Sequence, residues 1–266
     1  MLKFAANLTM MFNEAGTLLE RYEAAALAGF RYVECAFPYD VPAEKVAKRC
    51  NELRLEQVLI NTPIGTGPDE SKGMACLLDK KPTFRDSLRM AIEYAKALNC
   101  KRIHIMAGVE PQGSDHLHAE TTYLENLVYA GRELSEAGIT GLIEPINFIT
   151  VPGYFLNNCE QALRYLQQLP PNIRLQLDLF HLQMSQGCLS HNIRRYLPYT
   201  GHIQIAQVPD RHEPNSSGEI NYTYIFDLLR AMNYDGYIGL EYVPKQGTVA
   251  GLEWMKELRE GEALAQ

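Results

Sequence analysis

Four apolar segments in the second half of the sequence each carry a carboxylate or an amide that is flanked by aliphatic residues. The segments read LIEPI, LQLDLFH, HIQIAQV and IGLEYV, and these polar residues are Glu144, Asp178, Gln204 and Glu241. Each lies toward the C-terminal end of its segment. If the segments are adjacent strands of a buried parallel sheet, the four side chains converge on one point at the same edge of that sheet.

Burial of these side chains raises an electrostatic problem. An unpartnered buried carboxylate costs several kcal/mol, and three carboxylates in one site repel one another. One alternative is that each residue forms separate hydrogen bonds or salt bridges. We favour a shared divalent cation, because one ion compensates all of the charges. Two glutamates, one aspartate and one amide carbonyl are hard oxygen donors, so the sequence predicts Mg²⁺ or Mn²⁺ in preference to Zn²⁺.

Four basic side chains near the ends of candidate strands are predicted to bind a substrate. His181 follows Asp178 by three residues, His104 lies in RIHIMAG, Arg211 follows HIQIAQV, and Lys245 follows IGLEYV. The alternative for a lone histidine is a structural role in the core, and for a lone arginine or lysine it is simple solvation. Other polar residues in or at the end of candidate strands are Asn7, Glu34 and Asn61.

The elements that must position these residues repeat along the whole chain. Short runs of β-branched and aliphatic residues alternate with stretches of helical periodicity, such as FRDSLRMAIEYAKALNC. Eight such units within 266 residues predict an α/β fold, a single-domain (β/α)8 TIM barrel over residues 1–266, because open sheets usually stop at about five to seven strands. The predicted strands are Phe4–Leu8, Tyr32–Phe37, Gln57–Asn61, Arg102–Met106, Gly141–Ile146, Arg174–Phe180, His202–Val208 and Tyr237–Val243.

Two kinds of connecting segment support this reading. Gly29 and Gly138 follow helical stretches, where a left-handed C-cap residue is expected. The segments Thr62–Lys81 and Pro209–Gly218 are longer than usual loops, and both follow the C-terminal ends of predicted strands. That end carries the active site in this fold, so we predict a lid over the barrel mouth. The alternative is a pair of tolerated surface insertions.

The composition excludes several classes of function. A formal net charge of −7 provides no basic surface for nucleic acid, although a cleft can still be locally positive. No apolar window is long enough to span a membrane, and the N-terminal segment reads as a strand and a loop rather than a signal peptide. Six cysteines without a CxxC pair are typical of reduced thiols. We therefore expect a protein of the cytoplasm, with no membrane partner.

Longer motifs in the chain resemble the hydroxypyruvate isomerase family, which belongs to the xylose isomerase-like barrels together with the tagatose and allulose 3-epimerases. The resemblance covers nearly the whole chain. The ketose epimerases carry a histidine where this sequence has Gln204, which favours the isomerase branch. The motifs that carry the resemblance are FAANLTMMF, VLINTP, RIHIMAG, LIEPIN, LQLDLFH, HIQIAQVPDRHEP followed by GEINY, and GLEY.

The resemblance assigns roles to individual residues. It implies two catalytic glutamates, Glu144 and Glu241, a substrate-binding histidine at His181 and a substrate-binding arginine at Arg211. In the epimerases the arginine lies one residue nearer the third metal ligand than Arg211 lies to Gln204. One divalent metal, Mg²⁺ or Mn²⁺, is expected at Glu144, Asp178, Gln204 and Glu241.

The reaction implied is the interconversion of hydroxypyruvate and tartronate semialdehyde through an enediolate. We expect the metal to chelate the carbonyl and hydroxyl oxygens, while Glu144 and Glu241 remove and return the carbon-bound proton. Which glutamate is the base stays open. His181 would hydrogen-bond a substrate oxygen, and Arg211 and Lys245 would hold the substrate carboxylate.

Three other functions stay open at this point. The first is an isomerase or epimerase of a longer sugar acid or ketose that uses the same site. The second is phosphodiester cleavage, which the acidic composition and the seven histidines disfavour. The third is a barrel that binds a metal or ligand without catalysis. The partner expected in the main reading is a small hydroxy-carbonyl acid, and a homo-oligomer is left open.

Overall fold

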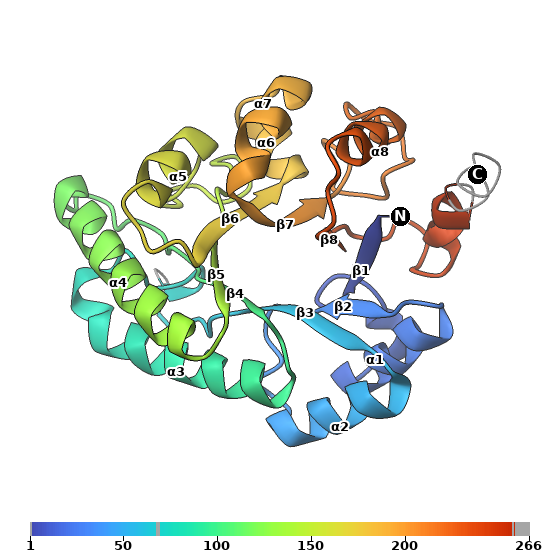
Figure 1. The fold of residues 1–266 in the computed structure, drawn as a ribbon, viewed down its shortest axis with the longest axis horizontal. Helices are drawn as coiled ribbons and strands as arrows, with labels where there is room; N and C mark the ends of the chain where they lie inside the picture. The colour runs from blue at the N-terminus through green and yellow to red at the C-terminus, as the bar shows by residue number, and fades with distance from the viewer. Residues whose placement is uncertain (1, 68–69, 257, 259–266) are drawn as a thin grey trace.

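A closed barrel of eight parallel strands forms the centre of the computed structural model, which describes residues 2–67, 70–256 and 258 (Figure 1). Each strand pairs with its neighbours in sequence, and β8 pairs with β1 to close the sheet. The predicted (β/α)8 barrel is confirmed, and each predicted strand overlaps an observed one. The strands are β1 (Lys3–Asn7), β2 (Tyr32–Glu34), β3 (Glu56–Asn61), β4 (Arg102–His104), β5 (Thr140–Ile143), β6 (Ile173–Asp178), β7 (Thr200–Ile205) and β8 (Tyr237–Leu240).

The predicted single domain runs over residues 1–266, and part of that range lies outside the described residues. The positions concerned are 1, 68–69, 257 and 259–266. The first long loop, predicted as part of a lid, therefore includes two positions that lie outside the described residues.

Side chains of the strands alternate between the barrel interior and the surrounding helices. In β6, Leu175 and Leu177 belong to the main apolar core, whereas Gln176 and Asp178 share the opposite face. Both faces are buried, as expected for a parallel sheet whose outer side is covered by helices. Polar residues on the inner face must therefore find partners inside the barrel.

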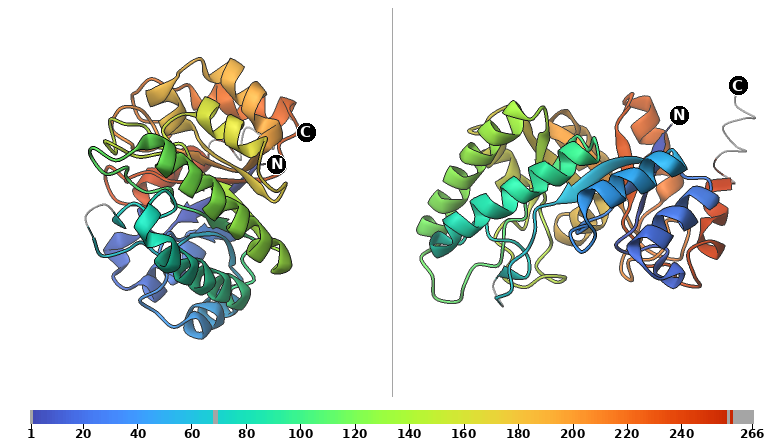
Figure 2. Two further views of the ribbon diagram at one scale, coloured as in Figure 1. Left: turned by 90° about the vertical axis from the view of Figure 1, so that its left-hand side faces the viewer. Right: turned by 90° about the horizontal axis from the view of Figure 1, so that it is seen from below.

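Helices cover the outside of the sheet, and two views at right angles show them surrounding it (Figure 2). The inner side of α4 shows why, because Tyr123, Leu127, Ala130 and Leu134 recur at helical spacing and are fully buried. The helices are α1 (Leu18–Leu27), α2 (Ala43–Leu53), α3 (Lys81–Ala97), α4 (His116–Glu136), α5 (Cys159–Leu166), α6 (Leu179–Ser185), α7 (Leu189–Tyr196) and α8 (Tyr222–Ala231), with short 3-10 turns at Asn13–Ala15, Leu78–Lys80, Leu197–Tyr199 and Ala250–Leu252.

Local signals set several of the helix ends. Gly29 and Gly138 adopt φ values of 86° and 65° just after α1 and α4, so the predicted left-handed caps are confirmed. Thr17 and Glu20 form a capping box at the start of α1. The side chain of Asn221 accepts a hydrogen bond from the backbone N–H of Tyr224 at the start of α8.

The two long loops are tied to the strand ends from which they leave. In the first, the backbone N–H of Cys76 donates to the carbonyl of Ala107, 2.8 Å away, just after β4. In the second, the amide nitrogen of Gln207 donates to the carbonyls of Pro214 at 3.1 Å and Ser216 at 3.2 Å. Both loops therefore lie at the predicted active-site end, and their role as a lid stays a prediction.

The six cysteines are all free thiols, and five of them are buried. This agrees with the expectation of reduced cysteines. Within the described part of the chain, no helix combines the length and the apolar character that crossing a bilayer requires.

The packing of α4 against the barrel yields a stability prediction. Leu127 is fully buried, whereas Leu117 on the same helix is 66% exposed. We expect Leu127→Ala to lower the free energy of unfolding by about 2–5 kcal/mol, because it leaves a cavity in the core. Leu117→Ala, the matched control, should change it by less than about 0.5 kcal/mol. Urea titrations of both variants measure the difference, and equal effects would contradict this account of the core.

Candidate metal centre and active site

The four predicted metal ligands lie at the C-terminal end of the barrel on adjacent strands. Glu144 directly follows β5, Asp178 ends β6, Gln204 lies in β7, and Glu241 directly follows β8. Asp178 is in register with Gln204. Three of the four are at most 4% exposed, and the side chain of Glu241 is 16% exposed. The strand register thus brings all four residues to one end of the barrel, as predicted.

Amide groups connect these ligands on one side of the mouth. The amide nitrogen of Gln176 donates to Oε2 of Glu144 at 3.0 Å and to Oε1 of Gln204 at 2.6 Å. The amide nitrogen of Gln204 donates to Oε1 of Glu34 at 2.8 Å, and so does that of Asn7, at 2.8 Å. Glu34 therefore joins the candidate site as a buried acceptor.

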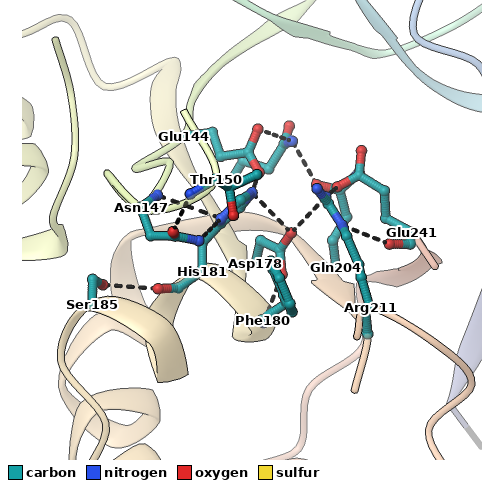
Figure 3. A network of polar contacts seen from close by, with 12 residues as sticks. Glu144, Asn147, Thr150, Asp178, Phe180, His181, Ser185, Gln204, Arg211 and Glu241 are labelled. Carbon is teal, nitrogen blue, oxygen red and sulfur yellow. Dashed lines mark hydrogen bonds and ion pairs between the residues drawn. The ribbon is translucent and has the colours of Figure 1, made fainter. Parts of the chain in front are cut away.

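The same network continues on the other side through charged groups. The amide nitrogen of Asn7 lies 3.4 Å from Oε1 of Glu241, whose Oε2 accepts from Nη2 of Arg211 at 2.6 Å. Nη2 of Arg211 lies 3.5 Å from Oδ2 of Asp178, and that oxygen lies 3.7 Å from Nε2 of His181. Nε2 of His181 lies 3.9 Å from Oε1 of Glu144, which completes a closed series of contacts (Figure 3). We call this closed circuit of contacts the mouth ring.

The tautomer of His181 follows from its contacts with the loop after β5. The backbone N–H of Asn147 donates to Nδ1 of His181 at 3.4 Å, and the side-chain amide nitrogen of Asn147 lies 2.6 Å from the same atom. Since Nδ1 accepts, a neutral imidazole carries its proton on Nε2. Nε2, which faces the carboxylates of Asp178 and Glu144, is then a donor. A donor at this place suits a substrate oxygen better than a metal ion.

Arg211 is held over the mouth from the loop after β7. Its guanidinium lies 4.9 Å from the centre of the Phe180 ring. Its backbone has a φ of 58°, and its carbonyl accepts from the backbone N–H of Val243. The loop after β7 is thereby joined to the segment after β8. A guanidinium fixed in this way is well placed to bind a carboxylate.

The pKa values of the two glutamates report the crowding of negative charge. Burial raises the pKa of Glu144 well above its ordinary value, and the charges of Glu241 and Asp178 raise it further. Burial raises the pKa of Glu241 to about 8, with Arg211 opposing the rise and Asp178 adding to it. Both carboxyl groups thus hold protons more tightly than exposed glutamates do.

The donor set fits a divalent cation. Oε1 of Glu144 and Oδ2 of Asp178 are buried and have no hydrogen-bond partner among the described residues. A carboxylate oxygen of Glu144 and one of Asp178 lie within 4.8 Å of each other, close enough to hold one ion, and a ring nitrogen of His181 lies within the same distance of both. A cation would satisfy the two orphaned oxygens and offset both the burial of the charges and their mutual repulsion, which together raise the pKa values of the glutamates.

The remaining predicted substrate-binding residues occupy different places. His104 is fully buried, and its Nδ1 lies 3.4 Å from Oε2 of Glu144 without hydrogen-bond geometry. Lys245 is exposed after β8, and its backbone N–H donates to Oε1 of Glu213. The structure thus brings His104 beside the mouth ring, whereas it shows no contact of the Lys245 side chain with the described ring residues.

Sequence reasoning missed part of the inner face. Gln176 was not singled out, although it lies two residues before Asp178 and therefore on the same face of β6. His202 stands in the same relation to Gln204 on β7, and its Nε2 lies 2.7 Å from Oε2 of Glu34. The signal that could have found both is the two-residue period applied backward from each predicted ligand.

Comparisons with known proteins agree with the barrel fold. Residues 22–258 match the family described as the xylose isomerase-like TIM barrel. The chain belongs to the xylose isomerase-like TIM barrel family. A Danio rerio protein provisionally named hydroxypyruvate isomerase is 49% identical, covering 96% of this chain and 95% of its own. The Escherichia coli hydroxypyruvate isomerase is 40% identical over 97% of this chain and its full length.

Two further proteins are similar to this chain over nearly its whole length. A 2-oxo-tetronate isomerase of Cupriavidus necator is 42% identical, covering 96% of this chain and 97% of its own. A crystal structure from Brucella melitensis, described as an AP endonuclease of family 2, is 42% identical with a TM-score of 0.93, covering 97% of this chain and 99% of that one. The membership predicted from the motifs, in the hydroxypyruvate isomerase branch of these barrels, is confirmed.

The burial of His104 yields a prediction for acid stability. Burial, together with the neighbouring His181 and His202, lowers the pKa of His104 to about 3. Unfolding lets the imidazole protonate near its ordinary 6.5, so the unfolded chain binds more protons below that pH. The stability that neutral His104 contributes is therefore present above pH 6.5 and is lost as the pH falls toward 3.

Thermal midpoints measured from pH 7 to pH 4 test this sign. His104→Gln should lose less stability over that range than the wild type, by up to about 1.4 kcal/mol per pH unit. His118→Gln is the control, because the His118 side chain is 72% exposed. If the stability of His104→Gln falls with decreasing pH as steeply as that of the wild type, the neutral buried imidazole is not the cause of the acid-induced loss of stability.

Proposed function

We propose that the protein is a hydroxypyruvate isomerase, which interconverts hydroxypyruvate and tartronate semialdehyde at the barrel mouth. One observation carries the proposal. Glu144 and Glu241 flank Asp178 within the mouth ring, which also contains Arg211 (Figure 3). Two carboxyl groups with raised pKa values suit proton transfer, and an adjacent guanidinium suits an acid substrate. The names of the relatives at 40% and 49% identity support the same activity.

The glutamates move one proton between neighbouring carbons of the substrate. One of them takes a proton from the hydroxymethyl carbon, and the same or the opposite glutamate delivers a proton to the former carbonyl carbon. The hydroxyl proton passes to the other oxygen, so no atom is gained or lost. In this proposal His181 donates from Nε2 to a substrate oxygen, and Arg211 binds the substrate carboxylate.

We place one divalent metal, Mg²⁺ or Mn²⁺, in the same site. Its proposed ligands are oxygen atoms of Glu144, Asp178, Gln204 and Glu241, a set that suits hard cations. When bound, the cation supplies electrostatic stabilisation for the negative charge that develops on the substrate oxygens. His104 and Lys245 stay proposed substrate contacts, His104 at the base of the site and Lys245 from the segment after β8.

A second candidate is the isomerisation of a four-carbon 2-oxo acid, which the name of the Cupriavidus necator relative favours. Assays with hydroxypyruvate and with four-carbon 2-oxo acids distinguish the two. We expect the higher kcat/KM with hydroxypyruvate, its loss in chelator, and its return with Mg²⁺ or Mn²⁺. A higher kcat/KM with the four-carbon acid would replace the proposed substrate, and full activity in chelator would remove the proposed metal.

We propose no nucleic-acid partner, because the net charge of −7 lacks the basic surface that such binding needs. The six free cysteines support a reducing compartment, the cytoplasm. The oligomeric state stays open, a homo-oligomer included.

Replacement of Glu241 tests its proposed role in proton transfer. Glu241→Gln keeps the shape of the side chain but removes its basicity, so we expect kcat/KM to fall by at least about 100-fold. Glu52→Gln on α2 is the control, because that carboxylate is 48% exposed and pairs with Lys48 and Arg49 on the surface. Thermal midpoints verify that both variants are folded. Near wild-type turnover in Glu241→Gln would contradict the mechanism.

A further inference from the structure

Glu34 is a buried carboxylate that the proposed chemistry does not use. It ends β2, on the opposite side of the barrel from β6, and is 1% exposed. Its Oε1 accepts from the amide nitrogens of Gln204 and Asn7, each at 2.8 Å, and its Oε2 lies 2.7 Å from Nε2 of His202. Both oxygens of Glu34 are therefore engaged with donors that come from two other strands, β1 and β7.

The contact with Glu34 decides which end of the Gln204 amide faces which neighbour. An amide offers a carbonyl oxygen and an NH2 group of nearly the same shape, so its orientation is set by its partners. A carboxylate only accepts, and the NH2 group of Gln204 must therefore face Glu34. The carbonyl oxygen then points the other way, where it lies 2.6 Å from the amide nitrogen of Gln176. That nitrogen also bonds Glu144.

This choice matters for a metal, because only the carbonyl oxygen of an amide can ligate a hard cation. With the NH2 group turned inward, the same side chain would present two N–H donors to the ion instead of a lone pair. A carboxylate that accepts from the NH2 group, on the side away from the ion, prevents this reversed orientation. Carboxylates orient metal-bound imidazoles in other proteins in the same way. Glu34 occupies that place relative to Gln204.

The position of Glu34 is itself fixed by a feature of β8. A Cβ atom added at Gly239 would lie 2.3 Å from Oε2 of Glu34 and 2.5 Å from its Oε1. Gly239 is also in register with Gln204. The absence of a side chain at this place therefore makes the space in which the carboxylate contacts Gln204 and His202.

We propose that Glu34 is a positioning residue of the metal centre, which holds the amide of Gln204 with its carbonyl oxygen directed toward the cation. The inference rests on the metal centre of the proposed function. Glu34 does not contact the ion in this proposal and acts only through Gln204. Its effect on metal affinity must therefore disappear when Gln204 no longer offers an amide.

Binding of Mn²⁺ to the metal-free protein, followed by the electron paramagnetic resonance signal of free Mn²⁺, measures this without any turnover. We expect Glu34→Gln to weaken Mn²⁺ binding about 10–100-fold, the usual range for loss of an orienting partner. The variant side chain has its own NH2 group and no longer dictates how the Gln204 amide lies. Glu56→Gln on β3 is the matched control and should bind as the wild type does, because Glu56 is exposed and accepts from the hydroxyl of Tyr237.

A double-mutant cycle separates orientation from charge. In a Gln204→Leu background no amide remains to be oriented, so adding Glu34→Gln should weaken Mn²⁺ binding no further. Equal weakening in both backgrounds would mean that Glu34 acts by its charge alone, and this result overturns the proposal. So does unchanged affinity in Glu34→Gln. If the wild type binds no Mn²⁺, the metal centre of the proposed function fails as well, which distinguishes the two failures.

Two further variants keep the test independent of a folding defect in Glu34→Gln. Gly239→Ala preserves every charge but displaces the Glu34 carboxylate, so it should also weaken Mn²⁺ binding, and only when Gln204 is present. Combining Glu34→Gln with Gln204→Glu exchanges the two side chains, and a carboxylate needs no orientation because its two oxygens are equivalent. This exchange should restore affinity to within about threefold of the wild type, a difference of less than about 0.7 kcal/mol. Failure of both variants to follow this pattern contradicts the proposal.

Discussion

Four carboxylates at one end of a closed parallel sheet set the conditions for the residues around them, and they belong to Glu34, Glu144, Asp178 and Glu241. Each buried oxygen must meet a donor or a cation, because it has lost its contact with bulk solvent. The barrel supplies donors mainly from neutral groups, the amides of Asn7 and Gln176 among them, which add no charge of their own. Two oxygens, on Glu144 and Asp178, have no hydrogen-bond donor in the part of the chain that the structure describes. The protein thus provides hydrogen-bond donors for most of the carboxylate oxygens. Oε1 of Glu144 and Oδ2 of Asp178 stay available to a cation.

The site also fixes the orientation of side chains that can both donate and accept hydrogen bonds, namely amides and imidazoles. The backbone N–H groups of Ile149 and Thr150 donate to Oδ1 of Asn147, which turns its NH2 group toward His181 and fixes the histidine tautomer. Glu34 does the equivalent for the amide of Gln204. In both cases a group that can only donate or only accept sets the direction of one that can do either. Such chains of contacts give the site a single arrangement before any ligand binds.

The sequence predicted the barrel and the convergence of the ligands, because both depend on short-range periodicity and strand order. A carboxylate such as Asp178 is easily recognised, because its neighbours in the strand are aliphatic. The Glu34–His202 contact joins residues 168 positions apart, and sequence alone does not show which residues face each other across a barrel. Gln57 illustrates the ambiguity, because it is buried in β3 yet bonds Tyr22 of α1. Lys245 was predicted from proximity to β8 alone, and its side chain is solvent-exposed.

Arg211 couples the acidic cluster to the substrate in the proposed reaction. Its Nη2 contacts both Glu241 at 2.6 Å and Asp178 at 3.5 Å, so it opposes the rise in the pKa of Glu241 that burial and the charge of Asp178 cause. The same guanidinium is the proposed partner of the substrate carboxylate. Its N–H groups would therefore have to serve both the substrate carboxylate and the carboxylates of Glu241 and Asp178. If Arg211 turns part of its hydrogen bonding to the substrate, its ion pair with Glu241 weakens and the pKa of Glu241 rises. In the proposed reaction, binding of an acid substrate would thereby raise the proton affinity of Glu241, whichever glutamate is the base, whereas a neutral sugar of similar size would leave the ion pair intact.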